Sequence, residues 1–203
     1  MGYIIVIILS YLLGSIPTGL LVGKALGGID IRRYGSGNIG ATNTLRVLGP
    51  KASAIVLIAD FAKGALPVML VALLTDNEVY KILAALGALV GHNWSIYMGF
   101  QGGRGVATGV GGLIVVSPIL GAINVGSGLA VIIASRYVSL GAIVGGSLII
   151  FVTALLFSIG AVSVQRFLYV VVGATMILFK HRANLERLLK GQEHRLGDSA
   201  QPS

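Results

Sequence analysis

Two glycine-rich polar segments interrupt an otherwise apolar sequence, and both have the composition of an anion-binding loop. The first reads GSGNIGATN over residues 35–43. Glycines allow the left-handed torsions that turn consecutive amides toward an anion, and a helix beginning near Ala41 would point its amino end there. A flexible linker is the alternative interpretation. The candidate donors are the amides and short side chains of Gly35, Ser36, Gly37, Asn38, Gly40, Thr42 and Asn43, with Arg46 one helical turn beyond.

The second segment reads GFQGGRGVATG over residues 99–109 and sets Arg104 among Gly102, Gly103 and Gly105. A helix is predicted to begin directly after it, so the segment again combines a permissive backbone, a cation and a helix amino end. The alternative is a tight turn whose arginine only marks the cytosolic side of a membrane. The first segment is not a nucleotide P-loop, because the lysine–serine/threonine ending is missing. Together the two segments favour two bound phosphates, or one large one.

Ionisable residues also lie inside or beside apolar runs. Asp60 and Lys63 are three residues apart in ADFAKG and share a helix face. Because each would cost about 2.5–3.5 kcal/mol unpaired at the bilayer centre, they form either an internal ion pair or a site where Lys63 faces a substrate. His92, in GHNW, lies near the end of the third apolar run. Packing or hydrogen bonding is favoured there over a catalytic role.

A basic segment, HRANLERLLKGQEHR, follows the last apolar run. His181 and Asn184 are three residues apart, so one helix face can present both, and Arg182 adds a cation beside them. A helix lying on the membrane surface is the alternative, and it is the interpretation favoured for Arg187 and Lys190.

The composition indicates an integral membrane protein. The 203 residues are 55% hydrophobic and 11% charged, against about 25% charged in soluble domains. The chain has no cysteine, which excludes disulfides, a thiolate nucleophile and a thioester intermediate. Its three histidines are dispersed and its carboxylates few, so neither a metal nor another cofactor is predicted. The net charge of +8 is assigned to loops that orient the chain in a bilayer, not to nucleic-acid binding.

The apolar runs predict an all-α, polytopic transmembrane bundle that forms a single domain over residues 1–203, with a basic tail at 181–203. Two short helices, at 106–116 and 118–134, make either a hairpin beside five full spans or two of seven spans. A bend is expected at GSIP, residues 14–17, because Pro17 removes a backbone donor. The remaining predicted spans are residues 2–26, 51–74, 80–98, 138–159 and 162–179.

The basic loops predict the orientation. Lysines and arginines gather in the two glycine-rich segments, in the SRY turn and in the tail, whereas the turns TDNE and SIGA carry none. The amino terminus is therefore predicted outside and the carboxyl terminus in the cytosol. This arrangement puts the three polar segments on one side of an inner, plasma membrane.

The three segments, in this order, resemble the motifs of the bacterial acyl-phosphate:glycerol-3-phosphate 1-acyltransferase family. The resemblance covers almost the whole chain and includes GSIPTG and DFAKG. It implies a plasma-membrane enzyme of phospholipid biosynthesis with about seven membrane segments. Such an enzyme moves a fatty acyl group from acyl phosphate to the 1-hydroxyl of sn-glycerol 3-phosphate, giving lysophosphatidic acid and phosphate. It does not use acyl-CoA or acyl carrier protein directly, and an acyl-phosphate-forming enzyme supplies its donor.

The chain departs from the family pattern at three positions. Gln101 and Arg104 stand where the family commonly has lysines, and Ser95 stands where proline is common. Arginine keeps the positive charge but replaces a compact ammonium with a planar fork. The loop chemistry is therefore expected to persist, with altered phosphate contacts.

Charge repulsion between the two implied substrates predicts which residues matter. Two phosphate dianions about 6 Å apart repel by roughly 11 kcal/mol at an effective dielectric near 20. Arg46, Arg104 and Arg182 are the cations expected to offset this, with Lys63 as a fourth. Ser36, Asn38 and the amides of Gly37 and Gly40 are assigned to acyl phosphate, and the acyl tail to a groove between helices that opens to membrane lipids. The residues assigned to glycerol 3-phosphate are Arg46, Arg104, His181 and Asn184.

Two other function classes fit the same features. Glycine-broken helices and basic pockets also suit a transporter of a phosphorylated metabolite, but the two halves of the sequence do not repeat. A structural or assembly protein would use the basic loops only for topology and lipid contact.

Overall fold

The computed structural model describes residues 1–198, and these residues confirm the all-α prediction. No strand forms among them, and one isolated antiparallel bridge joins Ser95 and Gln101. Two short 3-10 helices, Ile31–Arg33 and Ile96–Met98, lie in the connections. The α-helices are α1 (Gly2–Gly14), α2 (Thr18–Gly27), α3 (Ala41–Leu74), α4 (Glu78–Asn93), α5 (Val106–Val116), α6 (Pro118–Ser135), α7 (Val138–Ser158), α8 (Val164–Lys180) and α9 (Arg182–Leu189).

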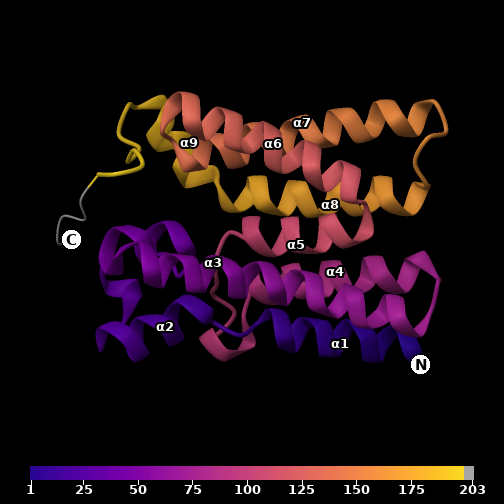
Figure 1. The fold of residues 1–203 in the computed structure, drawn as a ribbon, viewed down its shortest axis with the longest axis horizontal. Helices are drawn as coiled ribbons and strands as arrows, with labels where there is room; N and C mark the ends of the chain where they lie inside the picture. The colour runs from indigo at the N-terminus through magenta and orange to yellow at the C-terminus, as the bar shows by residue number, and fades with distance from the viewer. Residues whose placement is uncertain (199–203) are drawn as a thin grey trace.

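The helices form two groups with α5 between them (Figure 1). Helices α1 to α4 pack together on one side, and α6 to α8 pack together on the other. Helix α9 lies at the end opposite to the amino terminus. Because α5 contacts α3, α4, α6 and α8, it joins the two groups into one bundle.

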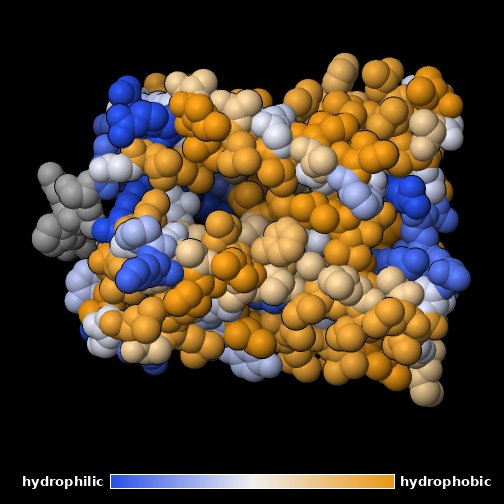
Figure 2. All heavy atoms as spheres, viewed as in Figure 1, coloured by the Kyte–Doolittle hydropathy of each residue, from blue (hydrophilic) through white to orange (hydrophobic). Residues whose placement is uncertain are grey.

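The outer surface suits a bilayer. Four segments are long and apolar enough to cross a membrane, namely residues 2–27 and helices α3, α6 and α7. Helices α4 and α8 run beside them with 16 and 17 residues. In Figure 2, hydrophobic residues cover most of the face shown, and hydrophilic residues gather at its two ends. The number of spans and their orientation remain predictions.

The bend predicted at GSIP separates α1 from α2, and other helices satisfy the backbone groups that it releases. Ser95 Oγ donates to Ser15 O at 2.5 Å, and Lys63 Nζ donates to Ile16 O at 2.9 Å. Residue 95 thus uses its hydroxyl for a contact, between the loop after α4 and the end of α1, that proline could not make. This contact also holds the loop after α4 against the break in the first helix.

Helix α3 begins at Ala41, the helix start that the first glycine-rich segment requires, and ten residues before the predicted span of residues 51–74. The predicted span was too short because Gly49 and Pro50 kink this helix without ending it. Gly49 has φ +83° and ψ −177°, outside the helical region, and α3 continues on both sides. The first glycine-rich segment therefore leads directly into α3, at Gly40, as its predicted anion-binding geometry requires.

Helices α3 and α5 pack backbone to backbone. A Cβ added at Gly64 would lie 2.0 Å from Thr108 O, and one at Gly111 would lie 2.2 Å from Phe61 O. Only glycine fits at such distances, so the two helix axes come unusually close. The contact joins α5 to the carboxyl-terminal half of α3.

Candidate active site

A cavity of about 990 Å³ opens at the end of the bundle that carries α9. It is visible as a hollow with hydrophilic residues in Figure 2. Its mouth is polar and its interior apolar, with walls from α3, α4, α5, α6, α7 and α8. The cavity therefore joins the three predicted polar segments to a chamber between helices. The predicted site residues that line it are Gly35, Ser36, Asn38, Gly40, Thr42, Asn43, Arg46, His92, Arg104, Gly105, His181 and Asn184.

Asn43 organises the first loop from within. Its Oδ1 accepts the amide of Ser36 at 2.9 Å, and its Nδ2 donates to Asn38 O at 2.9 Å and to Tyr34 O at 3.0 Å. Gly35 has φ +58°, and a Cβ there would lie 2.4 Å from Asn43 Oδ1. Gly35 is thus needed both for its positive φ and to leave room for the Asn43 side chain.

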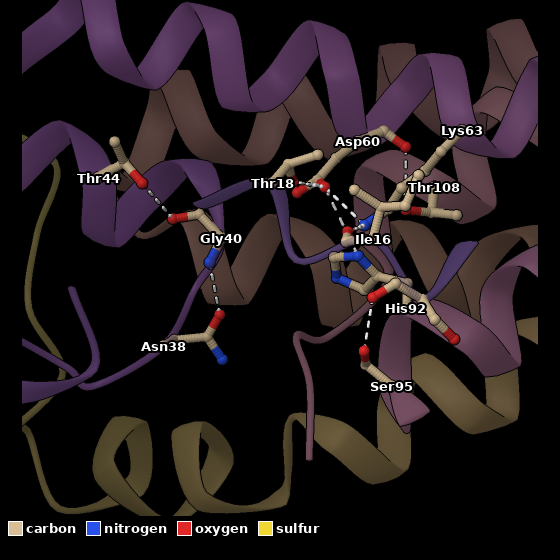
Figure 3. A network of polar contacts seen from close by, with 11 residues as sticks. Ile16, Thr18, Asn38, Gly40, Thr44, Asp60, Lys63, His92, Ser95 and Thr108 are labelled. Atoms are coloured by element: carbon tan, nitrogen blue, oxygen red, sulfur yellow. Dashed lines mark hydrogen bonds and ion pairs between the residues drawn. The ribbon is translucent and has the colours of Figure 1, made fainter. Parts of the chain in front are cut away.

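Two amides predicted to bind phosphate are already used inside this loop. The Gly37 amide donates to Tyr34 O at 3.1 Å, and the Gly40 amide donates to Asn38 Oδ1 at 2.9 Å, as Figure 3 shows for the latter. Each of these amides therefore has an acceptor within the loop and helps to shape it. Within residues 1–198 the hydroxyls of Ser36 and Thr42 and the Nδ2 of Asn38 have no protein partner, so they remain available as donors at the cavity wall.

The second loop folds around His92. The Gly103 amide donates to His92 O at 3.0 Å, and a Cβ at Gly103 would lie 2.1 Å from His92 Nε2. A Cβ at Gly102 would lie 2.2 Å from His92 O. Gly102 and Gly103 therefore stand against α4 and do not line the cavity. Their small size allows this part of the loop to pack against α4. Arg104 follows directly in the chain.

Arg104 is half-buried at the cavity wall, and no described residue accepts a hydrogen bond from its guanidinium. Burial lowers its pKa to about 10; nearby Glu193 opposes this shift, and the charges of Arg187 and Arg46 add to it. The side chain is still protonated at neutral pH. Arg104 is thus a cation with no counter-ion bonded to it among residues 1–198, which favours an anionic ligand.

In the third segment, one helix end presents both His181 and Asn184 to the cavity. His181 Nδ1 lies 2.8 Å from Ile177 O, the geometry of a ring N–H donating to a carbonyl. Burial lowers the pKa of His181 to about 4, although this hydrogen bond opposes the shift. The imidazole is therefore neutral at pH 7. Asn184 is buried, and its Oδ1 has no partner among residues 1–198.

Glu193 gathers three side chains at the mouth. Its Oε1 accepts from Asn184 Nδ2 at 2.7 Å and from Ser139 Oγ at 2.8 Å, and its Oε2 lies 2.8 Å from Arg187 Nε. Burial raises the pKa of this carboxyl, but the hydrogen bonds outweigh burial, so the pKa lies below its ordinary value. Glu193 thus stays ionised and fixes the amide of Asn184.

The charges at the mouth do not cancel. Three guanidiniums line the cavity, from Arg46, Arg104 and Arg187, against the carboxylates of Asp60 and Glu193. Asp60 is already paired with Lys63 at 2.9 Å, so it does not neutralise the mouth. The excess positive charge suits phosphate groups, and the apolar walls behind it suit a hydrocarbon chain.

Comparison with known proteins identifies the family. The family model described as glycerol-3-phosphate acyltransferase matches residues 4–191. This chain belongs to the glycerol-3-phosphate acyltransferase family. Family members named glycerol-3-phosphate acyltransferase include one from Thermoanaerobacter sp. (strain X514), 41% identical over 194 residues and 96% of each chain. The glycerol-3-phosphate acyltransferase 2 of Moorella thermoacetica (strain ATCC 39073 / JCM 9320) is 45% identical over 97% of this chain and 98% of its own.

The solved family structures agree with this fold. The crystal structure of PlsY (YgiH), an integral membrane glycerol 3-phosphate acyltransferase, in its glycerol 3-phosphate form is 36% identical, with a TM-score of 0.87. The match covers 97% of this chain and 96% of that one. The lysophosphatidic acid form is 35% identical with a TM-score of 0.85 over the same shares. The resemblance predicted from the three motifs is thus confirmed.

Some predicted site residues of this acyltransferase-family chain lie outside the cavity lining. Arg182 is exposed, donates to Phe179 O at 3.2 Å and lies over the Phe179 ring. Arg187, interpreted as a membrane-surface residue, takes the cavity position instead. Asn184 and Arg187 are three residues apart, so helical periodicity could have found this pair. The predicted residues that do not line the cavity are Gly37, Lys63, Gly102, Gly103 and Arg182.

Lys63 belongs to a buried polar cluster beneath the mouth (Figure 3). It is 4% exposed and pairs with Asp60 at 2.9 Å. Asp60 Oδ1 also accepts from Thr18 and lies 3.6 Å from His92 Nδ1. With its ammonium also bonded to Ile16 O, Lys63 fits the internal ion-pair alternative. The sequence analysis missed Ser139 and Glu193 as site residues. The position of Glu193 in the basic segment was the one feature of the sequence that could have indicated it.

Proposed function

We propose that this chain transfers a fatty acyl group from acyl phosphate to the 1-hydroxyl of sn-glycerol 3-phosphate, releasing lysophosphatidic acid and phosphate. The observation that carries the proposal is one cavity with three arginines at its mouth and an apolar chamber behind them. The relatives' names and the two PlsY forms support this activity. A transporter and a structural protein have no such support.

The site residues divide between the two substrates. Ser36, Asn38 and Thr42, with free donors at the first loop, hold the phosphate of the acyl donor. Arg46 and Arg104 hold glycerol 3-phosphate together with His181 and Asn184. Arg187 replaces Arg182 as the third cation at the mouth, and through Glu193 it also helps to fix Asn184.

The reaction needs positioning more than proton transfer by a side chain. The carbonyl carbon of acyl phosphate is already activated, and phosphate leaves readily. The 1-hydroxyl oxygen bonds to this carbon, the bond to the phosphate oxygen breaks, and the leaving phosphate takes the hydroxyl proton. The arginines stabilise the charge that develops, and the cavity holds both reactants in place.

The enzyme works at the cytosolic face of the plasma membrane in this proposal. The mouth lies at the end of the bundle that carries the basic segments, and basic loops favour the cytosol. Glycerol 3-phosphate then arrives from the cytosol, whereas the acyl chain enters the chamber from the bilayer. Acyl phosphate is supplied by a separate acyl-phosphate-forming enzyme.

A turnover assay tests the proposal. Purified protein is incubated with hexadecanoyl phosphate and labelled glycerol 3-phosphate, and the lipid products are separated. Labelled lysophosphatidic acid is expected, and none is expected when hexadecanoyl-CoA replaces the acyl phosphate. Uptake of label into sealed vesicles without any lipid product would instead support a transporter.

A further inference from the structure

The apolar chamber behind the polar mouth has a defined depth. Along α7, the lining residues run from Ser139 at the mouth to Ile149, ten residues or about 15 Å further on. Along α8, they run from His181, directly after the helix, to Tyr169, twelve residues or about 18 Å away. Half of a hydrocarbon core of about 30 Å is about 15 Å. The chamber is therefore as deep as one leaflet, the length of a membrane lipid's fatty chain.

Tyr169 closes the deep end. Its side chain is 3% exposed and crosses from α8 to α5, where the hydroxyl donates to Gly109 O at 3.3 Å. A Cβ added at Gly112 would lie 2.9 Å from that hydroxyl, so the ring is packed against α5. Leu113 and Ile149 are buried beside it in the same apolar cluster. A ring held in this way does not swing aside to admit more methylene groups.

Two glycines in the chamber wall are not explained by helix packing. A Cβ at Gly173 would lie 3.5 Å from Leu89 and 3.9 Å from Tyr169, and one at Gly146 would lie 3.5 Å from Leu178. These are ordinary van der Waals distances, and neither glycine has a positive φ. At Gly64 and Gly111, by contrast, a Cβ would collide with backbone. The empty space beside Gly146 and Gly173 belongs to the cavity.

We propose that Tyr169 sets the longest acyl chain that this enzyme uses, and that Gly146 and Gly173 keep the chamber wide enough for the chain to reach it. Gly173 lies one helical turn from Tyr169 toward the mouth, so a larger side chain there would shorten the chamber above its floor. The inference rests on the proposed function, since it needs acyl phosphate as the donor.

The test compares donors of different length. The ratio of kcat/KM for hexadecanoyl phosphate to that for dodecanoyl phosphate is measured with Gly173→Val and Gly146→Val. Each buried methylene changes binding by about fourfold. Excluding two or three methylenes should therefore shift the ratio about 15- to 60-fold toward the short donor. Tyr169→Phe should keep the ratio, and Tyr169→Ala should raise the relative use of icosanoyl phosphate.

Gly126→Val is the matched control. Gly126 is exposed on α6, outside the lining, and a Cβ there meets nothing within 4 Å, so the ratio should not change. Valine variants that use dodecanoyl phosphate with an unchanged ratio would overturn the inference. If they do not fold, the alanine variants replace them; a shift of about fourfold supports the inference, and an unchanged ratio overturns it. Failure of the unmodified protein with every acyl phosphate would instead overturn the proposed function.

Discussion

Arg46 comes from the first turns of α3 and Arg104 from the second glycine-rich segment, yet both line one cavity. Arg46→Ala and Ser36→Ala should each lower kcat/KM about 100-fold or more, because each removes a donor to a phosphate whose charge must be stabilised. The measurement is steady-state turnover with hexadecanoyl phosphate. Arg182→Ala is the control, since that exposed side chain does not line the cavity. Equal losses in Arg182→Ala and Arg46→Ala would contradict the placement of the cations.

The low pKa of His181 predicts how the stability of the protein depends on pH. This pKa is about 4 in the folded protein, below the ordinary value of 6.5, so the unfolded chain binds the proton more readily between these values. The free energy of unfolding should therefore fall as the pH is lowered from 6.5, by up to about 3 kcal/mol near pH 4. His181→Asn should show a shallower fall between pH 7.5 and 5 in thermal unfolding. An identical slope in both proteins would show that the histidine is not buried and neutral.

At the scale of helices, Lys63 supports the break in the first helix. Lys63→Met would leave Asp60 as an unpaired buried charge and Ile16 O without its donor, so it should cost about 3–5 kcal/mol of stability. Thermal unfolding in detergent measures the loss. Lys51→Met, at an exposed position of the same helix, should change little.

The same experiment separates the two interpretations of Lys63. Adding Asp60→Asn to Lys63→Met should restore part of the stability, because the unpaired charge is then gone. If Lys63 contacted substrate instead, Lys63→Met would keep its melting temperature and raise KM for glycerol 3-phosphate. That outcome would contradict the structural role assigned to the ion pair.

At the scale of the whole molecule, the absence of cysteine allows a direct test of sidedness. Ser36→Cys and Arg182→Cys place thiols at exposed positions near the mouth, and Asp76→Cys places one in the turn between α3 and α4. A membrane-impermeant maleimide should label the first two only in inside-out vesicles and the third only in right-side-out vesicles. Labelling of Ser36→Cys and Arg182→Cys from opposite sides would separate the segments that the cavity requires together.

Short-range features of the chain were predictable because their causes are local. Pro17 removes a donor and breaks the first helix wherever that helix lies. The glycine-rich segments precede the amino ends of α3 and α5 as predicted. The membrane class follows from apolar runs long enough to cross a bilayer. The three motifs indicated the family by their residues, their order and their spacing. Gly49 and Pro50 are the exception among these local predictions. A glycine followed by a proline is found both at kinks and at helix ends, so the sequence did not distinguish the two.

The composition of the mouth depended on how the helices rotate and pack against one another. Arg187 lines the cavity and Arg182 does not, although both are arginines of one basic helix. Ser139 reaches Glu193 across 54 residues of sequence, and the Gly37 and Gly40 amides are used within their own loop. The floor at Tyr169 likewise exists only where α8 meets α5. Residue type and spacing determine local structure, such as a turn or a helix end. A cavity wall is formed by side chains from several helices, so its residues depend on how those helices pack.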